Sequence, residues 1–83
     1  MNQKAILKNV ETVKVEQEQT LRTILESRMK LLNMDIEDLE EVAKKTLFSV
    51  DGVMVMGIKI LEKLETVVKS GQVVKLLPAK KAG

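Results

Sequence analysis

The chain lacks the side chains on which most small enzymes and disulfide-stabilised domains depend. Its 83 residues include no cysteine, histidine, tryptophan or tyrosine, and Phe48 is the single aromatic residue. Without cysteine and histidine, neither a disulfide nor a Cys/His metal site can add to the stability of the fold. A chain of this size seldom gains more than roughly 3–5 kcal/mol from its own core. The composition therefore favours self-association.

The same absences restrict the chemistry that the chain can perform. Ser49 and Ser70 have no histidine to activate them, and the sequence has no glycine-rich phosphate loop. Carboxylate pairs at helical spacing, such as Glu37 with Glu41, form a solvated helix face far more often than an acid–base or metal site. We therefore expect a protein that is not an enzyme and that holds no metal and no cofactor.

Long apolar runs and a targeting segment are also lacking. No charged and then apolar leader opens the chain, and no apolar run approaches the roughly 18 residues needed to span a bilayer. With the absence of cysteine, this predicts a cytoplasmic protein with no membrane partner. The net charge of +2, from 14 basic and 12 acidic residues, is too small to indicate nucleic-acid binding by itself.

The strongest periodic signal runs through residues 35–70. Asp35 can cap a helix start and Gly71 can take the left-handed conformation that ends a helix. The pair Asp51-Gly52 is a strong turn signal that leaves open two shorter helices, but the apolar stripe keeps its phase across it and favours one long helix. The stripe consists of Ile36, Leu39, Ala43, Leu47, Val50, Met54, Ile58, Leu61, Leu64 and Val68.

The N-terminal part, residues 3–32, is predicted to form a second helix. The alternation Val13-Lys14-Val15 leaves a short strand open as an alternative. A short connection centred on Asn33 predicts an antiparallel neighbour, so the expected fold class is all-α, a helical hairpin that assembles into an oligomeric bundle or coiled coil. Residues 1–71 would form this oligomerisation domain, and residues 72–83 a flexible C-terminal arm with a basic tail.

One partner helix cannot cover the second half of the long helix, which is apolar on nearly every side. We therefore expect a homo-oligomer, although adaptable methionine side chains would also suit a groove for a partner helix. The predicted oligomer interface consists of Leu47, Val50, Val53, Met54, Val55, Met56, Ile58, Leu61 and Leu64.

The C-terminal residues Val73, Val74, Leu76 and Leu77 are predicted to form a partner arm. This arm would dock on a neighbour, add a strand to the sheet of a partner, or fold over its own subunit. A helix-turn-helix reading of residues 39–56 is weak, because the second helix would offer bases almost no hydrogen-bonding side chains. The candidate phosphate contacts are Arg22, Arg28, Lys30, Lys75, Lys80 and Lys81.

These patterns predict a non-catalytic assembly or adaptor protein that self-associates and binds a protein partner. In size and composition the chain is similar to many small accessory proteins of phages, plasmids and bacteria, which is an analogy of composition only. The alternative is a small oligomeric regulator that binds nucleic acid through basic residues of the first helix and the tail. Salt dependence separates the two, because phosphate contacts weaken steeply as salt rises.

Overall fold

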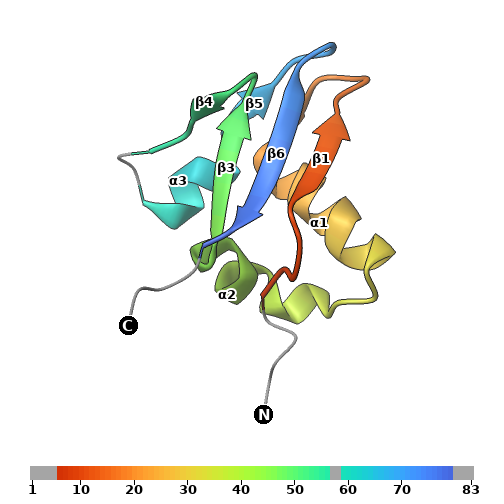
Figure 1. Cartoon of the computed structure of the whole chain (residues 1–83), viewed down its shortest axis with the longest axis vertical. Helices are drawn as coiled ribbons and strands as arrows, with labels where there is room; N and C mark the ends of the chain where they lie inside the picture. Colours follow the sequence, from red (N-terminus) through yellow and green to blue (C-terminus); the bar gives the residue numbers. More distant parts are fainter. Residues whose placement is uncertain (1–5, 57–58, 80–83) are drawn as a thin grey trace.

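The computed structural model describes residues 6–56 and 59–79, and in these ranges the chain folds as a mixed α/β protein (Figure 1). The main antiparallel sheet has the strand order β1–β6–β3–β4, with β1 at Glu11–Lys14, β6 at Val73–Pro78, β3 at Thr46–Val50 and β4 at Val53–Met54. A second sheet pairs β2 (Gln19–Thr20) with β5 (Val67–Val68). The helices are α1 (Leu21–Leu31), the 3-10 turn η1 (Ile36–Asp38), α2 (Leu39–Lys44) and α3 (Ile60–Leu64). The prediction of an all-α helical hairpin, bundle or coiled coil is therefore wrong.

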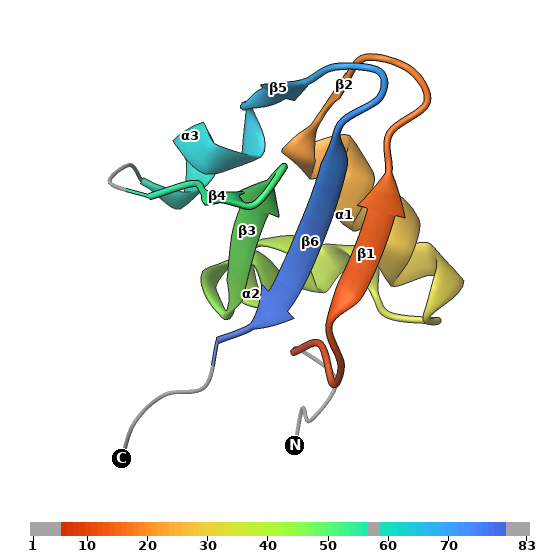
Figure 2. The same cartoon turned by 45° about the horizontal axis from the view of Figure 1, so that its top comes forward.

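The three α-helices lie on one side of the main sheet, as Figures 1 and 2 show from two directions. The core fills the space between the sheet and the helices. Its fully buried members include Phe48, Val74 and Leu76 from the strands. Leu25, Met29, Val42 and Leu64 face them from the helices and are also fully buried. The opposite side of the sheet, which we call the outer face, carries no helix from the described part of the chain.

The expected long helix is replaced in its middle by a β-hairpin. Asp51 and Gly52 have φ angles of 51° and 84°, so both take the left-handed conformation of a two-residue type I′ turn. The turn sets Val50 opposite Val53 and the preceding residue of β3 opposite Met54. The turn alternative at Asp51-Gly52 was therefore right about the chain reversal, but the flanking segments are strands and not helices.

Helical structure does begin after Asp35, where the sequence predicts it, as the 3-10 turn η1, but the side chain of Asp35 makes no capping hydrogen bond. Helix α2 ends at Lys44. The buried hydroxyl of Thr46 donates a hydrogen bond of 2.7 Å to the carbonyl of Val42, which closes the end of the helix. Strand β3 starts at Thr46, two residues after the end of α2. Among the described residues in the second half of the expected helix, only α3 is helical.

Of the first expected helix, the described residues are helical only in α1. Its C-terminus is closed where the sequence places the connection. Asn33 has a φ of 61°, its N–H bonds the carbonyl of Lys30 at 3.1 Å, and the N–H of Met34 bonds the carbonyl of Met29 at 2.8 Å. This is a Schellman motif. The alternative of a short strand near residues 13–15 is confirmed in outline by β1.

The expected flexible arm is a central strand. Strand β6 pairs with β1 on one side and with β3 on the other, and Val74 and Leu76 are fully buried. Val73–Pro78 therefore belongs to the same sheet as strand β1.

Asp51 fixes the hairpin turn to the beginning of β6. Its Oδ1 accepts a hydrogen bond of 2.9 Å from the N–H of Val73, and its own N–H donates to the carbonyl of Val73 at 2.8 Å. Its Oδ2 accepts a bond of 3.2 Å from the Gln72 amide. Gly71 has a φ of 92°, but it lies in the turn between β5 and β6 and not at the end of a helix.

Candidate functional site

The main sheet has two end strands, β4 and β1, and each presents backbone groups that its neighbour does not use. In an antiparallel pair, hydrogen-bonded positions alternate with positions whose N–H and C=O point away from the neighbour. Val55 donates to the carbonyl of Phe48 at 2.9 Å, so the backbone groups of Met54 point away from β3. Val15 donates to the carbonyl of Gln72 at 2.9 Å, so those of Thr12 and Lys14 point away from β6.

The first candidate site is the β4 edge, which we define as Val53, Met54, Val55 and Met56. Val53 is 69% exposed, Met54 38% and Met56 72%, whereas Val55 packs against the core. None of the four residues is charged. Proteins usually protect a free strand edge with a charge, a proline or a bulge, because an unprotected apolar edge pairs with another chain. The β4 edge has neither a charge nor a proline.

The structure separates the residues of the predicted oligomer interface. Leu61 is half exposed on α3, whereas Leu64 of the same helix is fully buried in the core. Leu47 is 43% exposed on the outer face, and Val50 is half-buried at the end of β3. Ile58 lies outside the described residues. The interface stays a prediction for the β4 edge and for Leu61, whose side chains are exposed. Leu64 is buried in its own subunit, so its side chain cannot contact a second copy.

The predicted partner arm contributes to the outer face instead. Leu77 stands opposite Leu47, and Lys75 stands opposite Ser49 on the same face. Val73 and Leu77 are half-buried, and Lys75 is exposed. Val74 and Leu76 point to the opposite, core side, so their side chains cannot contact a partner.

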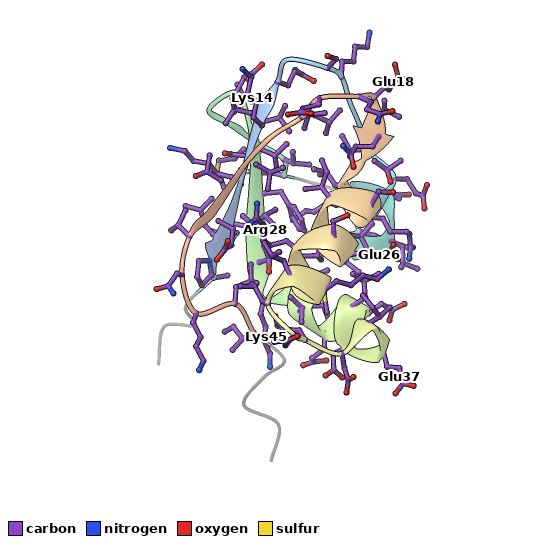
Figure 3. The ribbon with its side chains drawn as sticks, turned by 90° about the vertical axis from the view of Figure 1, so that its right-hand side faces the viewer. Lys14, Glu18, Glu26, Arg28, Glu37 and Lys45 are labelled. Atoms are coloured by element: carbon purple, nitrogen blue, oxygen red, sulfur yellow. The ribbon has the colours of Figure 1, made fainter. Side chains whose placement is uncertain are left out.

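The second candidate site is the β1–α1 groove, the open space between the free edge of β1 and helix α1. Figure 3 views the molecule from this side and shows Arg28 between the strand and the helix. One hollow of about 290 Å³ is lined by Val13, Gln19, Ile24, Ser27, Arg28 and Leu31. A second hollow of about 270 Å³ lies further toward the ends of β1 and α1, and its lining includes Ile6, Lys8, Glu11, Leu32 and Met34.

A half-buried ion pair separates the two hollows. The Nη1 atom of Arg28 lies 3.4 Å from Oε1 of Glu11, and their side chains are 23% and 17% exposed. The carboxylate of Glu11 has this partner. The exposed charges nearest to β1 along the chain are Lys8 before it, Lys14 at its end, and Glu16 and Glu18 beyond it. The groove is therefore apolar at its base, with lysines beside the strand and carboxylates beyond its end.

The candidate phosphate contacts do not form one surface. Lys75 lies on the outer face, whereas Arg28 points into the groove on the helix side. Arg22 forms an ion pair of 3.5 Å with Glu65, and Lys30 is exposed on α1. Lys80 and Lys81 lie outside the described residues. Nucleic-acid binding through these residues gains no support from their arrangement.

Within residues 6–56 and 59–79, no three acidic side chains gather closely enough to hold a metal ion. In the same part of the chain, no helix has the length and apolar character needed to cross a bilayer. The chain matches no family model, and no curated protein or solved structure matches it either.

Sequence reasoning missed the backbone groups of Thr12, Lys14 and Met54, which are the main features of both edges. Two signals predict the strands that carry these groups. One is the Asp-Gly pair between apolar runs, which is typical of a hairpin, and the other is the short alternation near Val13. Each signal identifies a strand, but neither tells which strand lies at the edge of the sheet.

Proposed function

We propose that this protein is a non-catalytic assembly or adaptor protein that pairs with a second copy of itself through the β4 edge and binds a protein partner elsewhere. The observation that carries the proposal is the exposed, uncharged β4 edge at the end of the main sheet. The proposal includes a cytoplasmic location, for which the absence of cysteine is the supporting feature.

The geometry of β4 suits a two-fold arrangement. The N–H and C=O of Met54 both point outward, so an axis beside this residue would let Met54 exchange two hydrogen bonds with Met54 of the second copy. An isologous contact of this kind closes after two subunits and gives a dimer. The two main sheets would then continue into one another across the axis.

A second copy is the occupant that best fits the β4 edge. The edge carries no charge of its own, so two copies meet without like-charge repulsion. The methionines repack readily against a neighbour, and burying exposed apolar surface stabilises the contact at roughly 25 cal/mol per Å². The β1 edge is a worse match for β4, because Lys14 and Glu11 flank its free backbone groups.

The experiment is sedimentation equilibrium of the wild-type chain and of Met54→Pro. Proline removes an N–H that a single subunit leaves facing water, and proline is tolerated at such edge positions. We expect the wild type to be a dimer that dissociates on dilution, and Met54→Pro to be a folded monomer of about 9.3 kDa. A wild-type monomer at all concentrations would refute the proposal.

Val55→Pro provides the matched control. This substitution removes the hydrogen bond from Val55 to Phe48 inside the subunit, so it should lower the stability of the fold itself. Circular dichroism distinguishes the two variants, because Met54→Pro should keep the wild-type spectrum. If Met54→Pro remains as dimeric as the wild type, the β4 edge is not the interface.

A further inference from the structure

We propose that the β1–α1 groove binds an extended peptide of a partner protein, which adds a strand to β1 and carries aliphatic residues alternating with acidic ones. This inference rests on the proposed adaptor function, because it specifies how the protein partner is bound. It involves the opposite end of the main sheet from the β4 edge, so the two sites can be tested separately.

Free backbone groups on β1 supply the first part of the recognition. Thr12 and Lys14 each direct an N–H and a C=O away from β6, which leaves four groups for an added strand. Both residues are exposed, so a peptide can reach their backbones. Main-chain hydrogen bonds of this kind provide affinity in strand addition, while pockets for alternate side chains provide specificity.

The two hollows supply the pockets. They lie beside Val13 and Glu11, which are two residues apart on the helix-facing side of β1. Successive side chains on one face of an added strand have the same spacing, so two aliphatic residues of the peptide would enter the two hollows. Leu31 is 69% exposed and Leu32 is 41% exposed at the helix wall, and they would cover these side chains.

Charge selects the residues between the two aliphatic positions. The intervening side chains of an added strand point to the other side of the sheet, where Lys14 is exposed beside the free edge. Lys75 is also exposed on this outer side, opposite Thr12. Acidic residues at the intervening positions would therefore be attracted, and lysines repelled. The uncharged β4 edge of another copy lacks these acidic groups.

The test uses ¹⁵N-labelled full-length protein and three synthetic eight-residue peptides: alternating valine and aspartate, alternating valine and lysine, and a scramble of the first peptide that breaks the alternation. We expect the valine–aspartate peptide to shift the amide resonances of Thr12 and Lys14 and to slow their hydrogen exchange. The amides of Met54 and Val55 should stay unchanged. The other two peptides should bind at least about tenfold more weakly.

Two variants locate the binding. Thr12→Pro removes an outward N–H that β6 does not use, and Leu31→Asp places a negative charge at an exposed position of the groove wall. Each should weaken binding of the valine–aspartate peptide about tenfold or more without changing the circular dichroism spectrum. Lys59→Glu, an exposed substitution near the β4 side of the sheet, should bind the peptide as the wild type does.

The inference is overturned if no peptide perturbs Thr12 and Lys14, if the lysine peptide binds as well as the aspartate peptide, or if the perturbed amides are those of Met54 and Val55. A monomeric wild type that binds the peptide at β1 would refute self-association and leave this inference intact. A dimeric wild type that binds none of the three peptides would support self-association and refute this inference.

Discussion

Substitution of two adjacent residues in β3 tests whether this segment is a strand. The helical stripe in the sequence includes Leu47 and omits Phe48, whereas in the structure Phe48 is fully buried and Leu47 is 43% exposed. Phe48→Ala removes a buried ring from the centre of the core and should lower the free energy of unfolding by about 3–5 kcal/mol. Leu47→Ala removes a partly exposed side chain and should lower it by about 1 kcal/mol.

These magnitudes are large relative to the total. A chain of 83 residues has an unfolding free energy of about 4–12 kcal/mol, so Phe48→Ala should leave the fold marginal. The assay is urea denaturation followed by circular dichroism at one fixed protein concentration, with both variants in the Met54→Pro background to remove any effect of assembly. If Leu47→Ala is as destabilising as Phe48→Ala, then Phe48 does not face the core while Leu47 faces outward, and residues 46–50 do not alternate as a strand.

Substitutions at three further positions test the turns by the same denaturation assay. Gly52→Ala should lower the free energy of unfolding by about 1–2 kcal/mol through backbone strain alone, because the φ of Gly52 is +84° and no atom lies within 4 Å of an added Cβ; an unchanged stability would argue against the type I′ turn. Asn33→Ala should be destabilising by about 1 kcal/mol while Asn33→Gly should not, since glycine suits the left-handed position better. Asp51→Ala should be destabilising by about 1–2 kcal/mol, and Asp51→Asn by less, because asparagine keeps a side-chain acceptor for the N–H of Val73; equal effects would show that this bond contributes little.

Local signals in the sequence identified several boundaries correctly. The helical turn after Asp35 and the end of α1 near Asn33 each depend on a few neighbouring residues, and each is present in the structure. The reversal at Asp51-Gly52 is present too, although the sequence analysis favours one long helix and keeps the turn only as the alternative. These features are predictable because capping and turn conformations are set by local backbone geometry. The alternation around Val13 also predicts a short strand, and β1 lies there in the structure.

The main error came from assigning the wrong period to residues 46–56. Apolar residues at Leu47, Val50 and Met54 fit a helical spacing, but the same segment also has a two-residue turn between two apolar runs. Thr46 and Phe48 alternate with an exposed Leu47, which is the pattern of a half-buried strand. The Asp-Gly pair is the stronger signal here, because it favours a type I′ turn, whose two left-handed residues interrupt a helix.

The position of β6 could not be predicted from local patterns. Its apolar run predicts an extended segment, but its pairing with β1 joins residues at opposite ends of the chain. Such long-range pairings leave no signal in a short window of sequence. For the same reason, the sequence could not show that β4 and β1 are the free edges, and the candidate sites became visible only in the folded sheet.

Hydrogen exchange at Met54 tests the proposed assembly most directly. In a single subunit the N–H of Met54 faces water, while that of Val55 is bonded to Phe48. Exchange followed by nuclear magnetic resonance over a hundredfold range of protein concentration should show the amide of Met54 becoming protected as the dimer forms, with Val55 protected throughout. If sedimentation shows a dimer and Met54 still exchanges at the same rate at every concentration, pairing of the β4 edges is contradicted.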